Sequence, residues 1–208
     1  MPKTSSLMSR VLLASLMAMS VLGPAWAQQS PTVRIRGTIE AVDGSLLAVK
    51  SREGTEMKVR LTDNVAVFGV AKTAISEIKP GSYIGVSAMP EPDGTQRALA
   101  VQIFPESQRG VAEGFRPWDL RPNSTMTNAT VAETVAGTDG EIILVKYKDG
   151  EKKVLVPPDT PVVSFVAGDR SELKPGARII IFSATRKDDG TLEAARVNVG
   201  RDGITPPM

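Results

Sequence analysis

Apolar and polar residues alternate along much of the chain after residue 30, a pattern typical of strands that bury one face. In the first such segment Val33, Ile35 and Ile39 fall on one side, whereas Arg34 and Arg36 fall on the other. A period of two residues indicates a half-buried strand. Apolar runs bounded by turn residues follow at 46–49, 57–61, 83–88 and 97–104. The pattern therefore predicts five strands between residues 31 and 104.

Turn residues indicate how these strands connect. Asp43-Gly44 and residues 52–54 predict turns between the first three strands, and residues 92–95 predict a hairpin turn between the last two. Residues 76–81 allow at most one helical turn, because proline and glycine at its end stop a helix. Three strands, a short helical turn and a hairpin is the order of a five-stranded OB-like barrel. A generic curled sheet of the same order is the alternative.

The same pattern occurs twice in the chain. Lys-Pro-Gly at 79–81 recurs at 174–176, and Asp-Gly-Thr at 93–95 recurs at 189–191, so the offset is 95 to 96 residues. Copies of roughly 70 residues are small for independent stability, so we expect them to pack on one another. The predicted fold is all-β, with two tandem small OB-like β-barrel repeats. The predicted divisions are a signal peptide (1–27), a first repeat (31–104), a connector (105–126), a second repeat (127–200) and a C-terminal tail (201–208).

The first 27 residues have the features of a secretory signal peptide. Lys3 and Arg10 precede an apolar run from 11 to 23, and alanines flank Trp26 in the pattern of a cleavage site. We therefore expect a periplasmic protein whose mature chain begins at Gln28. An uncleaved anchor helix is the alternative, although the apolar run is shorter than the about 20 residues of a membrane span.

Composition narrows the chemistry of the mature chain. The full chain has 25 basic and 23 acidic residues, and the leader holds two of the basic ones, which leaves the charges balanced. We therefore expect no nucleic-acid partner and no membrane insertion after cleavage. The chain has no cysteine and no histidine, which excludes thiolate or imidazole metal sites and Ser-His-Asp catalysis. We predict no catalytic residue, no metal ligand and no cofactor.

The repeated turn motifs resemble an exported bacterial domain family of unknown function. In that family Lys-Pro-Gly follows a leucine or isoleucine, and Asp-Gly-Thr precedes an alanine-rich strand, as in both copies here. The arrangement, including Arg-Pro-Trp at 116–118, is similar to small two-repeat exported proteins of proteobacteria, some of which carry the label metal transporter permease. A permease needs several apolar spans, and this sequence has none after the signal, so we do not adopt that activity.

The connector supplies the candidate binding residues. Prolines stiffen it, and the candidate residues beside them are Phe115, Arg116, Trp118, Asp119 and Arg121. An arginine there can stack on the indole or pair with Asp119. Trp118 has three interpretations: it packs between the copies, it lines an inter-repeat groove that binds a ligand, or it is exposed.

These features favour an exported, non-enzymatic binding or accessory module. Its partner is an unknown envelope protein, polymer or small molecule. A structural subunit of an envelope or metal-uptake assembly is one alternative. A carboxylate-dependent hydrolase of envelope carbohydrate is another, but the acid pairs Glu91/Asp93 and Asp188/Asp189 lie in expected hairpin turns, where solvent keeps carboxylates ionised.

Overall fold

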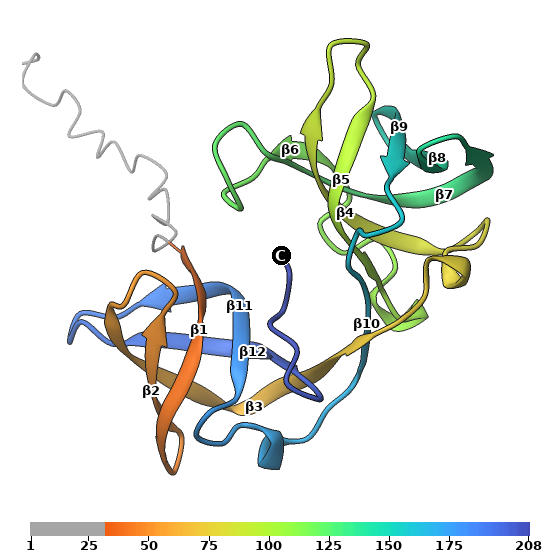
Figure 1. Ribbon diagram of the computed structural model, residues 1–208. Helices are drawn as coiled ribbons and strands as arrows, with labels where there is room; N and C mark the ends of the chain where they lie inside the picture. The colour runs from red at the N-terminus through yellow and green to blue at the C-terminus, as the bar shows by residue number, and fades with distance from the viewer. Residues whose placement is uncertain (1–31) are drawn as a thin grey trace, which may run out of the picture.

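The computed structural model describes residues 32–208, which form an all-β protein with a closed β-barrel architecture. The predicted signal peptide lies outside the described residues. Figure 1 shows two lobes joined by the long strand β3 and by β10. Within the described part of the chain, no helix has the length and hydrophobicity that crossing a membrane requires.

The first lobe is a ring of five strands, here called ring 1. β1 pairs antiparallel with β2 and β11, β2 with β3, and β11 with β12, and the parallel pair β12–β3 closes the ring. Leu47, Val59 and Ile181 are among its fully buried core side chains. The strands of ring 1 are β1 (Thr32–Asp43), β2 (Leu46–Ser51), β3 (Glu56–Lys72), β11 (Arg178–Arg186) and β12 (Leu192–Gly200).

The second lobe, ring 2, repeats the same pairing order. β7 pairs antiparallel with β8 and β4, β8 with β9, and β4 with β5, and the parallel pair β5–β9 closes the ring. Ile84, Ile143 and Val154 lie in its core. Its strands are β4 (Tyr83–Pro90), β5 (Gln96–Ile103), β7 (Thr125–Gly137), β8 (Gly140–Tyr147) and β9 (Gly150–Val156). The short elements are η1 (Ile75–Glu77), η2 (Glu106–Gln108), η3 (Arg170–Glu172), β6 (Gly114–Pro117) and β10 (Val162–Ala167).

The two sequence copies exchange their hairpins. Ring 1 combines the first three strands of copy 31–104 with the hairpin of copy 127–200, and ring 2 has the reverse composition. This differs from the expectation that each copy closes its own barrel. The physical reason is β3, which runs 17 residues without a turn and carries the chain out of ring 1 before the hairpin β4–β5 begins.

The crossing segments hold the rings together. The end of β3 pairs antiparallel with β10, with Val70 opposite Phe165. In copy 127–200 the prolines at 157, 158 and 161 interrupt the segment that matches β3, because proline cannot donate to a strand ladder. The result is the separate strands β9 and β10 in place of one long strand.

A third apolar cluster fills the region between the rings, and we call it the inter-ring cluster. It contains side chains of both rings and of the crossing strands, so it ties the two lobes into one unit. Trp118 and Phe182 pack against it, and its buried members are Val70, Tyr83, Ala100, Phe104, Met126, Val163, Phe165, Ile180 and Met208.

Candidate functional site

The connector brings Trp118 to the inter-ring cluster. β6 extends the sheet by pairing with β7, and the Trp118 backbone N–H then donates to the carbonyl of Ser124 at 2.8 Å. The half-buried indole lies 6.3 Å from the ring of Phe182 on β11, centroid to centroid. Trp118 therefore contacts ring 1 from a connector that is anchored on ring 2.

Three arginines surround the indole. The guanidinium carbon of Arg34 lies 3.6 Å from the ring centroid, and those of Arg116 and Arg36 lie at 5.6 and 6.0 Å. Arg34 and Arg36 share the outer face of β1 because Ile35 between them points into the core of ring 1. Cations on an aromatic face gain about 0.5–2 kcal/mol each.

Asp119 neutralises part of this charge. Its carboxylate oxygen Oδ1 lies 2.6 Å from Arg34 Nη1 and 2.7 Å from Arg36 Nη2. Burial opposes ionisation of this carboxyl, but hydrogen bonds from Arg36 and Arg34 outweigh that effect and lower the pKa of Asp119 to about 2. The pKa of Arg116 is lowered by desolvation and then by the charge of Arg34. One carboxylate thus bridges two of the three guanidinium groups around the indole.

The other two predicted site residues lie elsewhere. Phe115 is 40% exposed, and the Lys152 ammonium lies 4.5 Å from its ring centroid on ring 2. Arg121 is exposed in a turn, where its backbone N–H donates to Ser124 Oγ. The structure therefore brings Arg116, Trp118 and Asp119 together and separates Phe115 and Arg121 from them.

The space beside this cluster is occupied by residues 203–208, which we call the tail segment. Figure 1 shows residue 208, marked C, between the two rings. Arg178 Nη1 donates to the carbonyl of Gly203 at 2.7 Å, Arg52 Nη2 donates to the carbonyl of Pro206 at 2.7 Å, and Arg36 Nε donates to the main-chain oxygen of Met208.

Apolar contacts also hold the tail segment in place. Pro206 is buried, and Met208 is 1% exposed within the inter-ring cluster. Buried polar main chain requires partners, and Arg52 and Arg36 supply them at Pro206 and Met208. Sequence reasoning missed Arg36, Arg52 and Arg178, because the periodicity placed arginines on a polar face without showing what that face contacts.

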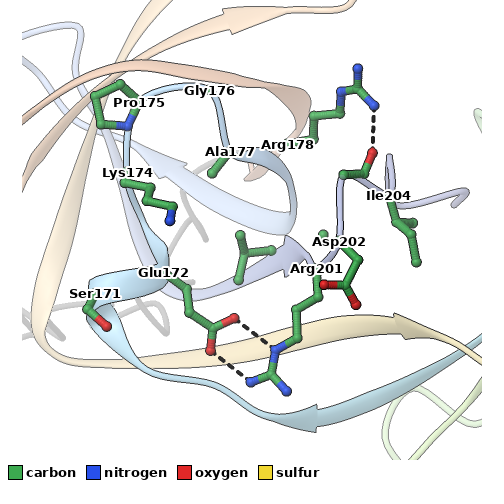
Figure 2. A pocket seen from close by; sticks show the side chains of 13 residues that line it. Ser171, Glu172, Lys174, Pro175, Gly176, Ala177, Arg178, Arg201, Asp202 and Ile204 are labelled. Atoms are coloured by element: carbon green, nitrogen blue, oxygen red, sulfur yellow. Dashed lines mark hydrogen bonds and ion pairs between the residues drawn. The ribbon is translucent and has the colours of Figure 1, made fainter.

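The start of the tail segment borders a pocket of about 680 Å³ (Figure 2). Arg201 closes one side through two hydrogen bonds to Glu172, at 2.9 and 2.8 Å, and a third to the carbonyl of Ala167. The hydrogen bonds from Arg201 lower the pKa of Glu172. Figure 2 places Lys174 and Asp202 on opposite walls. Arg201 thus fixes the point from which the tail segment leaves β12.

A smaller cavity of about 200 Å³ lies beside two of the arginines that surround Trp118. Arg34, Arg36 and Glu53 line it together with the hydroxyl-bearing Ser51 and Thr55. Two nearby donors, Arg34 Nε and Trp118 Nε1, are buried and have no hydrogen-bond partner within residues 32–208. Two buried N–H groups in this region are therefore available to donate to an acceptor of a ligand.

The described residues offer little for acid–base catalysis. Tyr83 has its pKa raised to about 12 by burial and then by Glu113, and its hydroxyl donates to the carbonyl of Val111. Asp93 and Asp189 lie in the hairpin turns, where hydrogen bonds from the following threonines lower their pKa values. A general acid needs a raised carboxyl pKa, which neither aspartate has.

The arrangement can thus bind an extended chain through main-chain oxygens, an apolar side chain and anionic groups. Comparisons of this chain with protein-family models, with curated proteins and with solved structures found no match.

Proposed function

We propose that the protein is an exported, non-enzymatic binding module that receives an extended polypeptide segment between its two rings. The observation that carries this proposal is the tail segment, which occupies the site in the manner of a bound peptide. Its main-chain oxygens accept hydrogen bonds from Arg178, Arg52 and Arg36, and its Met208 side chain enters the inter-ring cluster.

The barrel class is part of the same proposal. In each ring the strands neighbour one another in the order first, second, third, fifth, fourth, and the third and fifth are parallel. This order supports two OB-like barrels, a class whose members bind oligomeric ligands on a sheet face. Fold analogy carries little weight for function, so the argument depends on the tail segment.

In binding of an extended peptide, different contacts determine affinity and selectivity. Hydrogen bonds to main-chain oxygens are available to any extended segment, whereas a buried side chain selects by shape. Here the arginines contact residues 203, 206 and 208, and the buried positions are Pro206 and Met208. We therefore expect a partner segment with an apolar residue two positions after a proline or similar residue.

The test is binding in trans. A chain ending at Asp202 should bind a synthetic peptide of residues 202–208, observed as a change in Trp118 fluorescence and by titration calorimetry. Trp118 is the one tryptophan after the leader, so its emission reports on this site. A peptide carrying Met208→Ala is the matched control and should bind at least about tenfold more weakly, because truncating a buried methionine costs about 2 kcal/mol or more.

Two results would contradict the proposal. One is a folded, shortened chain that binds neither peptide. The other is equal binding of both peptides, because the buried Met208 side chain would then contribute nothing. Circular dichroism and a thermal melt of the shortened chain establish that it is folded before titration.

A further inference from the structure

The next step rests on the proposed function and names the chemistry of the partner. We infer that the site occupied by the tail segment selects an acidic polypeptide segment, whose carboxylate lies among Arg34, Arg36 and Arg52. The tail segment itself carries no charged side chain at 203–208, so none of its side chains pairs with these arginines.

Positive charge exceeds negative charge along the site. Within the described residues, Asp119 pairs with two of the arginines and Glu53 lies at the cavity, whereas Gly203 and Pro206 offer Arg178 and Arg52 uncharged carbonyl oxygens. The arginines that contact the tail segment or surround Trp118 are Arg34, Arg36, Arg52, Arg116 and Arg178.

The neighbouring groups respond to this positive field. The pKa of Arg52 is lowered by desolvation and by the charge of Arg36. The pKa of Glu53 is lowered by its hydrogen bond with Ser51, with further contributions from Arg36 and Arg52. The carboxylates at the site are therefore held ionised, and the cations repel one another. An added carboxylate relieves that repulsion.

The geometry offers a place for the carboxylate. The cavity of about 200 Å³ is lined by Arg34 and Arg36 beside two hydroxyl-bearing residues. Arg34 Nε and Trp118 Nε1 are buried donors without a partner within residues 32–208. A hydrogen bond from a guanidinium to a carboxylate is about twice as strong as one between neutral groups. A ligand that supplies a carboxylate thus replaces weaker contacts of the tail segment with stronger ones.

The position that tests this inference is 207. The main-chain oxygens of Pro206 and Met208 accept from Arg52 and Arg36, so the side chain at 207 lies between two residues held by arginines. Three peptides of residues 202–208, with Pro207→Glu, Pro207→Gln and Pro207→Lys, differ there in charge. They are titrated against the chain ending at Asp202.

We expect the glutamate peptide to bind about tenfold more tightly than the glutamine peptide at low salt, and the lysine peptide more weakly than both. The ratio should shrink in 0.5 M NaCl, because salt screens charges beyond about 3 to 5 Å. Arg52→Gln should reduce the preference for glutamate to below threefold. Arg186→Gln, an exposed arginine at the far end of β11, is the matched control and should leave it unchanged.

The outcomes separate the two proposals. Equal binding of the three peptides overturns the acidic preference and leaves the peptide site in place. No binding of any peptide, including the unmodified one, overturns the proposed function. Displacement of the glutamate peptide by an oligomer of glucuronate at lower concentration than by the peptide itself overturns the choice of polypeptide as the partner.

Discussion

Replacing Gly200 with alanine provides a selective way to expel the tail segment. Gly200 ends β12 and pairs with Val70 of β3. A Cβ atom there would overlap the main-chain carbonyl group of Ile204 and come within 3.3 Å of Pro206 Cδ. Both contacts belong to the tail segment or its first turn. The backbone of Gly200 lies outside the left-handed region, so alanine fits the strand once the tail segment moves away.

The free energy that holds the tail segment in place sets an upper limit on the loss of folding stability caused by Gly200→Ala. Burial of Met208 and three hydrogen bonds from charged donors contribute about 7 kcal/mol. Ordering six residues costs about 5 kcal/mol, less than usual because two are prolines with restricted backbones. The balance is about 2 kcal/mol, so roughly 3% of molecules have the tail segment released. Gly200→Ala should therefore cost at most about 2 kcal/mol, since release ends the clash.

Urea unfolding of both proteins, with and without residues 203–208, measures this effect. In a thermal melt of the full-length protein the same cost should lower Tm by at most about 4–8 °C for a chain of this size. In the shortened protein the substitution should be neutral or slightly stabilising, because alanine disfavours the unfolded state relative to glycine. Equal destabilisation in both backgrounds would refute the reasoning, because the clash would then lie within ring 1.

Three further results follow from the described contacts. Trp118→Ala should cost about 2–3 kcal/mol in urea unfolding, below the value for a fully buried indole, because the ring is half-exposed; an unchanged midpoint would contradict its packing role. The lowered pKa of Asp119, about 2, should stabilise the fold above about pH 4, and this contribution of about 1 kcal/mol after screening is lost as pH falls toward 2; Asp119→Asn should flatten that part of the stability profile. A protease site inserted at Gly110-Val111 should give two fragments that coelute in buffer and separate in urea, because each ring contains strands of both; separation in buffer would contradict the strand exchange.

Much of the strand pattern can be predicted from the sequence, because one face of each strand must be buried inside its ring. Ile35 and Ile39 are core residues of ring 1 as the alternation predicts, and Arg34 and Arg36 lie outside. The pairing of Asp119 with these arginines joins positions more than 80 residues apart. No local pattern carries that information, so the connector could be identified as a candidate site without its partners.

The hairpin exchange is invisible in the sequence for a different reason. The two copies carry similar strands, so either hairpin satisfies the burial pattern of either ring. The choice depends on whether the chain turns back after the third strand, and β3 continues instead to Lys72. The position of the tail segment could not be predicted either. Its sequence has no hydrophobic period or charge pattern, and its ordering depends on contacts with arginines that are distant in the sequence.

The exchange also constrains how a partner reaches the site. The rings are linked by β3 and β10, whose five paired residues must separate before the rings can move apart. A ligand therefore gains access by release of the tail segment and not by opening of the rings. In stopped-flow fluorescence of Trp118, the binding rate of the glutamate peptide should reach a plateau at the rate of tail release. In the chain ending at Asp202 the rate should instead rise linearly with peptide concentration. A linear rise in the unmodified protein would show that the tail segment does not gate the site.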